Sequence, residues 1–228
     1  MNARLANAVF AALIAFALSA CAALPKGSLP PSGGMVSAAD PRAAEAGPAM
    51  LHGGRNATDA AIATMLALTV VEPQSSGIGG GGFYLRAAPG GEVVTLDGRE
   101  TAPAGDGPDW FLDADGKPLA YRQAVESGLS TGVPANIALA AEAHRRHGAL
   151  PWAALFDPAI RLAREGWTVT PRLHDFLQRS AARASRDPAG RALFFDADGA
   201  PLPVGSRIVN PALADTLERI AQEGSPAF

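Results

Sequence analysis

Cysteine is nearly absent from this 228-residue chain, aromatic residues are scarce, and neither sign of charge forms a block. With aromatics at 6%, stacking platforms for nucleic-acid bases are not expected. A net charge of -3 likewise gives no reason to expect a nucleic-acid partner. Without a run of like charges, neither an acidic tail nor a polybasic membrane patch is predicted. What remains, 48% hydrophobic and 18% charged residues, fits a globular protein with one sizeable core or two small ones.

The single cysteine, Cys21, follows an N-terminal segment with its own pattern. Arg4 precedes an apolar run over residues 8–20, which is short for a membrane span but typical of a signal-peptide core. The sequence Leu-Ser-Ala-Cys at its end resembles a bacterial lipoprotein signal, cut before a cysteine that then carries the lipid. The alternative is ordinary signal cleavage nearby, which leaves an incidental cysteine. We therefore predict a signal peptide over 1–20, a flexible tether over 21–34 that is rich in Pro, Gly and Ser, and a folded domain over 35–228.

Residues 56–71 are apolar nearly all round, which predicts a buried helix with Asn56 as its N-cap. Asp59 stands where the acid of a capping box would lie. Two strands, 82–88 and 92–96, flank Pro-Gly-Gly and predict a hairpin, and the segment 106–126 is typical of a loop. Proline, cap and glycine signals then predict further helices. These begin at Pro134 (ending at His147), Pro151, Pro158 (ending at Gly166), Thr170-Pro171, and Asn210-Pro211 (ending at Gly224). The order indicates an α+β or mixed layered fold.

Three patterns that could indicate a bound cofactor or metal have better explanations. Residues 77–82 match G-x-G-x-x-G, but a helix precedes and a strand follows, the reverse of a dinucleotide site. Two Asp-Ala-Asp-Gly echoes, at 113–116 and 196–199, are too short for calcium loops and are better explained as turns. His144 and His147 could share a helix face, but no carboxylate at metal-site spacing joins them, so a solvated face is the better interpretation. We expect no metal and no cofactor.

The strongest candidate site combines a glycine-rich segment with one arginine. Five of the six residues from Gly77 to Gly82 are glycine, which indicates unusual torsion angles or a close approach of the backbone to a ligand or another strand. Arg99 follows the second predicted strand, where a guanidinium can hold a carboxylate with two parallel hydrogen bonds. A surface arginine that merely ends the strand is the alternative.

Taken in order, several segments resemble the N-terminal motifs of the γ-glutamyltransferase (glutathione hydrolase) family. The similarity covers nearly everything from Met35 to Phe228, although Ala135 stands where glycine is commoner in the family. No single motif is decisive, but the ordered series is highly specific. The segments are 53–61 (GGRNATDAA), 73–83 (PQSSGIGGGGF), 97–103 (DGRETAP), 130–134 (STGVP), 147–152 (HGALPW) and 158–166 (PAIRLAREG).

The resemblance implies an N-terminal nucleophile hydrolase fold, a four-layer αββα sandwich that is incomplete in this chain. It implies a proenzyme that cuts itself into a large and a small subunit, with a threonine at the new N-terminus attacking γ-glutamyl amides such as glutathione. The γ-glutamyl group then passes to water, an amino acid or a dipeptide. Arg99 matches the family arginine that binds the substrate α-carboxylate.

None of the threonines of this chain lies in anything like the family's Thr-Thr-His cleavage motif. We therefore expect the nucleophile to lie beyond this chain, and the chain alone to be inactive. We expect a periplasmic or cell-envelope location, with membrane contact only through lipid on Cys21. The alternatives are a related glutaryl- or cephalosporin-type acylase of the same fold, and a non-catalytic exported lipoprotein or binding module that uses the Arg99 pocket alone.

Overall fold

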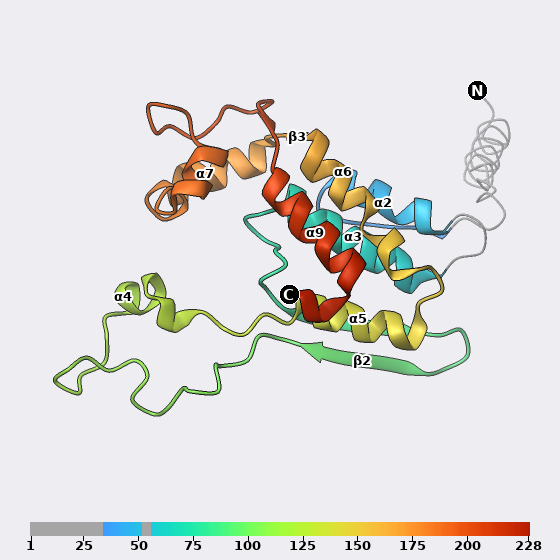
Figure 1. Cartoon of the computed structure of the whole chain (residues 1–228), viewed down its shortest axis with the longest axis horizontal. Coiled ribbons are helices and arrows are strands. Elements are labelled where there is room, and N and C mark those ends of the chain that lie inside the picture. Colours follow the sequence, from blue (N-terminus) through green and yellow to red (C-terminus); the bar gives the residue numbers. More distant parts are fainter. Residues whose placement is uncertain (1–33, 52–55) are drawn as a thin grey trace, which may run out of the picture. The chain divides into compact units, whose positions relative to one another are not determined.

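The computed structural model describes residues 34–51 and 56–228. The predicted signal peptide, Cys21 and all of the predicted tether except Gly34 lie outside the described residues, so these assignments stay predictions. Within the described ranges, none of the helices combines the length and apolar character needed to cross a bilayer. The principal elements, seen in Figure 1, are α2 (Pro41–Leu51), α3 (Ala57–Val71), β1 (Gly82–Ala87), β2 (Val93–Gly98), α4 (Tyr121–Glu126), α5 (Asn136–His147), α6 (Asp157–Glu165), β3 (Trp167–Thr168), α7 (Pro171–Ala184), α8 (Pro188–Phe194), β4 (Arg207–Ile208) and α9 (Pro211–Glu223).

Helix α3 is the buried centre of the described part of the chain. Eleven of its 15 residues are buried, and the Asn56 side chain accepts a hydrogen bond from the backbone N–H of Asp59. The predicted buried helix and its cap are therefore confirmed. The predicted role of Asp59 is wrong, because its buried carboxylate accepts hydrogen bonds from the backbone N–H groups of Ala149 and Leu150. It thereby ties the start of α3 to the chain that follows α5.

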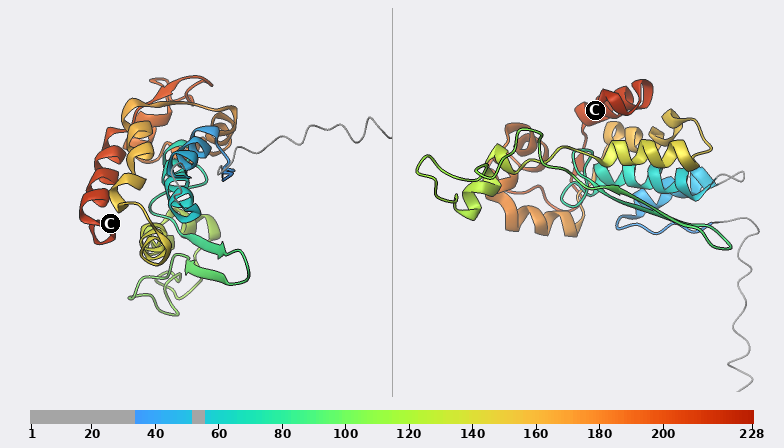
Figure 2. Two further views of the ribbon diagram at one scale, coloured as in Figure 1. Left: turned by 90° about the vertical axis from the view of Figure 1, so that its right-hand side faces the viewer. Right: turned by 90° about the horizontal axis from the view of Figure 1, so that it is seen from below.

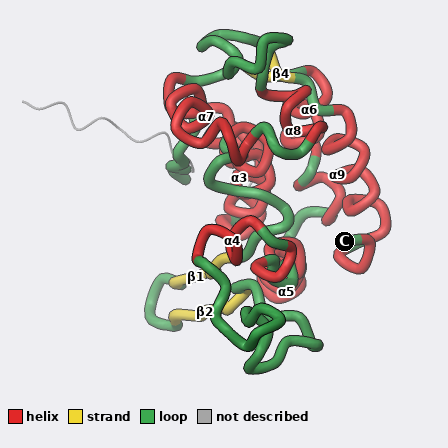
Figure 3. The backbone as a smooth tube through the Cα atoms, turned by 90° about the vertical axis from the view of Figure 1, so that its left-hand side faces the viewer, coloured by secondary structure: helices red, strands yellow, loops and turns green. Residues whose placement is uncertain are grey.

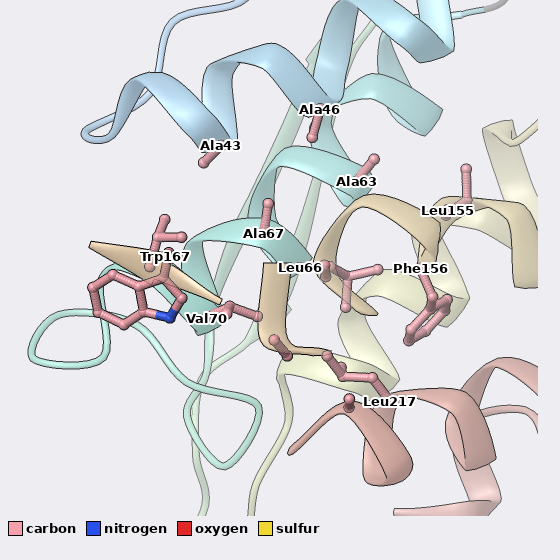
Figure 4. Close-up of a cluster of buried hydrophobic side chains, with 14 of the residues drawn as sticks. Ala43, Ala46, Ala63, Leu66, Ala67, Val70, Leu155, Phe156, Trp167 and Leu217 are labelled. Carbon is pink, nitrogen blue, oxygen red and sulfur yellow. The ribbon is translucent and has the colours of Figure 1, made fainter. Parts of the chain in front are cut away.

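The core is built around α3 from small residues on one side and large ones on the other. Figure 4 shows α2 lying across α3, with alanines at the contact, and larger side chains beyond it: Leu155 and Phe156 just before α6, and Leu217 of α9. Alanines allow two helix backbones to approach closely, while each buried Leu or Phe contributes about 1.5–3 kcal/mol. The labelled buried residues are Ala43, Ala46, Ala63, Leu66, Ala67, Val70, Leu155, Phe156, Trp167 and Leu217.

The predicted hairpin is confirmed as the antiparallel pair β1–β2, with Gly82 opposite Gly98 and Ala87 opposite Val93. The second strand extends two residues further than expected, to Gly98. One face packs against the core through Tyr84 and Leu96, beside α5 as Figure 2 shows. The other face exposes apolar side chains beside Thr95 and Asp97: Phe83 is 70% exposed, Leu85 68% and Val93 60%.

The C-terminal helices follow their sequence signals closely. Thr170 caps α7 by accepting from the backbone N–H of Leu173, and Asn210 caps α9 in the same way with Leu213. Glycines end α6 and α9, as predicted. The predicted helix from Pro134 begins two residues later, at Asn136, and the turn after Pro151 is a short 3-10 helix over Trp152–Leu155.

The two Asp-Ala-Asp-Gly echoes are turns, as predicted. In each, the first aspartate accepts two backbone N–H bonds with its Oδ1, from residues two and four positions later. Each turn then places its glycine in the left-handed region, with φ of 74° at Gly116 and 81° at Gly199. The carboxylate of the first aspartate is hydrogen-bonded within its own loop in both cases. Turn formation therefore explains the repeated sequence without calcium binding.

Five of the elements named above are not predicted by the sequence: α2, α4, α8 and the two short paired strands β3 and β4. Helix α4 lies inside the segment 106–126, for which the sequence predicts a loop; Figure 3 shows it as a short helix flanked by loops. It has no side-chain cap and no buried residue, and an Arg122–Glu126 ion pair of 2.9 Å spans its length. Such a short, exposed helix leaves little hydrophobic pattern in the sequence.

Candidate functional site

The glycine-rich segment lies between α3 and β1 and is held by the N-terminus of α5. The Gly80 carbonyl accepts hydrogen bonds from the backbone N–H groups of Ala135 (3.0 Å) and Asn136 (2.9 Å). The Asn136 side chain adds a third bond, from its Nδ2 to the Gly77 carbonyl at 2.7 Å. Because the first N–H groups of a helix have no partner within it, these carbonyls both satisfy α5 and fix the glycine segment.

Close approach, and not unusual torsion, explains Gly81, whereas an added Cβ atom at Gly77 or Gly79 would meet nothing within 4 Å. None of the residues from Gly77 to Gly82 is among the positive-φ glycines of the described chain. A side chain at Gly81 would collide with the Gly98 carbonyl oxygen and lie 2.8 Å from the Glu100 nitrogen. At Gly98 a Cβ atom would lie 2.6 Å from Leu139 Cβ on α5. Gly81 therefore lets the segment approach the backbone at the end of β2, and Gly98 lets β2 approach the Leu139 side chain of α5.

Arg99 stands one residue past the end of β2, as predicted. Its backbone N–H donates to Asp97 Oδ1 at 2.9 Å, which fixes the turn out of the strand. The side chain is 57% exposed, and its Nη1 lies 2.8 Å from Glu100 Oε2. That contact falls within ion-pair distance but outside hydrogen-bonding geometry, since this buried oxygen has no hydrogen-bond partner among the described residues. The guanidinium is thus paired with Glu100 through Nη1, and its other donors make no hydrogen bond to the described residues and are available to a ligand.

A pocket of about 530 Å³ opens beside Arg99, a size within the usual range for small-molecule sites. The Val133 N–H donates to the Thr101 carbonyl at 2.8 Å, which joins the two chain segments that contribute most of the lining. Trp110 also lines the pocket, and its Nε1 donates to the Leu129 carbonyl at 2.8 Å. The lining residues are Gly79, Arg99, Glu100, Thr101, Ala102, Pro103, Asp106, Trp110, Phe111, Leu129, Ser130, Thr131 and Gly132.

The structure brings together most of what the sequence singled out here. Arg99, the 99–103 segment and the 130–132 segment line the same pocket, although only Gly79 of the glycine run reaches it. Trp110 and Phe111 were missed because they lie in a stretch with loop composition. The two adjacent aromatic residues between Pro-Asp and an aspartate-rich turn were the one available signal.

The histidines are placed differently from the expectation of a solvated helix face. Both side chains are partly buried. His144 Nε2 lies 2.8 Å from the Leu150 carbonyl and its ring packs on Trp152, whereas His147 stacks on Tyr84 at 6.3 Å. Their neighbours come from other segments, so the helix pattern alone could not reveal this packing. Across residues 34–51 and 56–228, no group of three or more His, Cys, Asp or Glu side chains could hold a metal ion.

Comparison with known sequences identifies the same family as the ordered series of motifs. The family model described as Gamma-glutamyltranspeptidase matches residues 43–228. The chain is 41% identical over 197 residues to "Glutathione hydrolase 3" of Arabidopsis thaliana, covering 86% of this chain and 30% of that protein. It is 37% identical over 196 residues to the "Glutathione hydrolase proenzyme" of Bacillus subtilis (strain 168), covering 86% and 33%. The chain thus spans about a third of the length of these curated relatives.

Comparison with solved structures shows the same fold. The Helicobacter pylori gamma-glutamyltranspeptidase superposes with a TM-score of 0.80 at 33% identity, over 86% of this chain and 56% of that one. A cephalosporin acylase from Bacillus halodurans gives 0.66 at 33% identity, over 84% and 36%. The fold is therefore the predicted mixed α and β fold of the N-terminal nucleophile hydrolase class. Within that class, the chain belongs to the γ-glutamyltranspeptidase family.

Proposed function

We propose that this chain is the N-terminal part of the large subunit of a γ-glutamyltransferase or glutathione hydrolase, and that Arg99 binds the α-carboxylate of the γ-glutamyl substrate. The observation that carries this proposal is the half-exposed guanidinium at the pocket beside β2, with its donors not engaged in hydrogen bonds to the described residues. A guanidinium matches a carboxylate with two parallel charged hydrogen bonds.

In the proposed reaction, a threonine oxygen supplied by the rest of the protein attacks the γ-carbonyl carbon, and the bond to the amine breaks. The amine leaves with a proton, and water or an acceptor amine then releases the γ-glutamyl group from the ester. Arg99 takes no proton in this sequence, because it stays charged throughout. It fixes one end of the substrate so that the carbonyl is presented in a defined place.

Replacing Arg99 tests this role in the complete precursor. Arg99→Ala should lower kcat/KM for a γ-glutamyl anilide by roughly thirty-fold to a thousand-fold, because a lost charged hydrogen-bond pair costs on the order of 2–4 kcal/mol. Arg145→Ala is the matched control, since Arg145 is 69% exposed and pairs only with Glu142 on its own helix. Unchanged kinetics in Arg99→Ala would remove Arg99 from the site.

A related acylase of the same fold is the second candidate, favoured by the structural likeness to the cephalosporin acylase. A glutaryl anilide differs from the γ-glutamyl anilide only in lacking the α-amino group, and both keep the carboxylate that Arg99 would bind. Faster turnover of the glutaryl compound would favour the acylase. Faster turnover of the γ-glutamyl compound would favour the γ-glutamyltransferase.

The non-catalytic alternative predicts a different gene sequence downstream of Phe228. A downstream Thr-Thr-His motif would support the enzyme, and a stop codon directly after Phe228 would support a remnant that uses the Arg99 pocket alone.

We propose a small subunit from the same precursor as the partner of this chain, and a periplasmic or cell-envelope location with a lipid anchor on Cys21. The exposed apolar face of the hairpin supports the need for a partner surface. The anchor is tested by the mass of the mature protein: we expect an N-terminus at Cys21 that bears acyl chains. A mature N-terminus elsewhere, or an unmodified cysteine, would exclude the anchor.

A further inference from the structure

Glu72 is a buried carboxylate that the proposed chemistry does not use. It follows α3 directly and is only 2% exposed. Its Oε2 accepts a hydrogen bond from Gln74 Nε2 at 2.8 Å and lies 3.1 Å from Nε of Arg172, on the first turn of α7. Burying a carboxylate is unfavourable unless its partners compensate, so a core position alone does not explain this residue.

The partners of Glu72 show what it holds in place. Its backbone carbonyl accepts hydrogen bonds from the N–H groups of Ser75 and Ser76, both at 2.9 Å. The Arg172 guanidinium also donates from Nη2 to Ser75 Oγ at 3.3 Å. The four residues after Glu72 therefore turn back over it, and Arg172 of α7 contacts this turn through Glu72 and Ser75.

This turn continues directly into the glycine-rich segment of the Arg99 pocket. Gly77 is the next residue, and its carbonyl accepts from Asn136 Nδ2. Gly79 lines the pocket, and Gly81 lies against the backbone nitrogen of Glu100. Glycine has little conformational preference of its own, so the path of this segment depends on its two anchors. Glu72 is the anchor on one end and Asn136 the anchor on the other.

We propose that Glu72 is a positioning residue: with Arg172, it sets the path of the glycine-rich segment and thereby the geometry in which the Arg99 pocket receives a carboxylate. This inference rests on the proposed function for its kinetic consequence. Its structural consequence, a fixed path for residues 73–82, is independent of any activity.

The kinetic test uses the complete precursor. Glu72→Gln keeps the shape but removes the charge that pairs with Arg172, and we expect KM for a γ-glutamyl anilide to rise about ten- to a hundredfold with little change in kcat, because small misplacements of a binding group cost factors of that order. Arg172→Gln, which alters only an exposed side chain, should act in the same direction and more weakly. Glu142→Gln is the control, as this carboxylate pairs with Arg145 and Arg146 on the exposed side of α5.

A double-mutant cycle separates positioning from general destabilisation. If Glu72 acts through the Arg99 pocket, Glu72→Gln should change kcat/KM by less than about twofold once Arg99 is already alanine. A 4-aminobutyryl anilide, which keeps the amine but lacks the carboxylate, should be turned over equally by wild type and Glu72→Gln. A full Glu72 effect in the Arg99→Ala background, or an equal loss with both substrates, would overturn the proposal.

Hydrogen exchange on the same chain tests the structural consequence of the proposal, the fixed path of residues 73–82. Amides of residues 75–82 should exchange faster in Glu72→Gln and Arg172→Gln, whereas those within α3 should keep their protection. Unchanged exchange over 75–82 would refute the positioning role even in an active enzyme. If exchange rises as expected but wild type leaves γ-glutamyl amides intact, the proposed function fails and the structural claim stands.

Discussion

At the scale of single residues, the glycine-rich segment separates glycines that are required from glycines that are replaceable. Gly81→Ala should destabilise the chain by about 1–3 kcal/mol, because the added methyl group meets backbone atoms of Gly98 and Glu100 that cannot move aside. Gly77→Ala is the control: nothing lies within 4 Å of its added Cβ atom, so its stability should stay the same or rise slightly. Urea unfolding of both variants measures the difference, and equal stabilities would argue against close approach as the reason for Gly81.

Residues whose partners are close in sequence were predictable, and those with distant partners were not. Asn56, Thr170 and Asn210 cap helices through atoms three residues away, and the local pattern reveals such contacts. Asp59 and His147 show the opposite case. The Asp59 carboxylate accepts hydrogen bonds from backbone N–H groups about 90 residues away, and His147 stacks on Tyr84 of β1.

At the scale of elements, α2 forms through tertiary packing although its sequence has low helix propensity. It contains Gly47 and Pro48, both unfavourable inside helices, and the sequence does not predict it. Gly47 is needed at that position, because a Cβ atom there would lie 2.6 Å from Val36. The alanines of α2 pack on α3 (Figure 4), and this tertiary contact stabilises a helix that local propensity does not favour.

The start of α2 is fixed by a buried ion pair with a definite pH dependence. Asp40 is 2% exposed; its Oδ1 accepts from the backbone N–H and Nε of Arg42, and its Oδ2 pairs with Nη2 at 2.5 Å. Burial alone would raise the pKa of Asp40, but these hydrogen bonds and the charge of Arg42 outweigh burial and hold the pKa below its ordinary value of 3.8. A lowered folded pKa means that the stabilisation is complete above pH 3.8 and is lost as the pH falls through the folded value.

We therefore expect Asp40→Asn to lower the free energy of unfolding at pH 7 by about 1–3 kcal/mol. The gap between wild type and variant should shrink as the pH falls below 3.8, since the wild-type carboxylate then becomes protonated. Urea titrations between pH 7 and pH 3 measure it, with Asp175→Asn at an exposed position of α7 as the control. A gap that stays constant with pH would show that the charge of Asp40 contributes nothing.

At the scale of the whole molecule, the order of motifs predicted the fold class and the family, while the composition of the pocket wall stayed hidden. Arg99 and the glycines were visible because arginine at a strand end and five glycines in six residues are unusual in themselves. Trp110 and Leu129 become neighbours only through the hydrogen bond that closes the loop between them. A contact of that kind has no periodic signature in the sequence.

The exposed face of the β1–β2 hairpin governs how this chain behaves on its own. Two-stranded sheets are marginal without further packing, and a row of exposed apolar side chains marks an interaction surface. Phe83 and Leu85 are 70% and 68% exposed. We therefore expect the isolated chain to self-associate, and the double variant Phe83→Lys/Leu85→Lys to be monomeric at the same concentration by sedimentation velocity.

The same double variant distinguishes a surface that binds the small subunit from one that only associates non-specifically. If this face contacts the proposed small subunit, the complete precursor carrying both lysines should mature slowly or fail to assemble, because charges would be buried without partners. Val204→Lys is the control: Val204 is also apolar and 51% exposed, but it lies in the turn before β4. Normal maturation of the double variant, with the isolated chain nonetheless made monomeric, would place the subunit contact elsewhere and leave the hairpin face as a site of non-specific association.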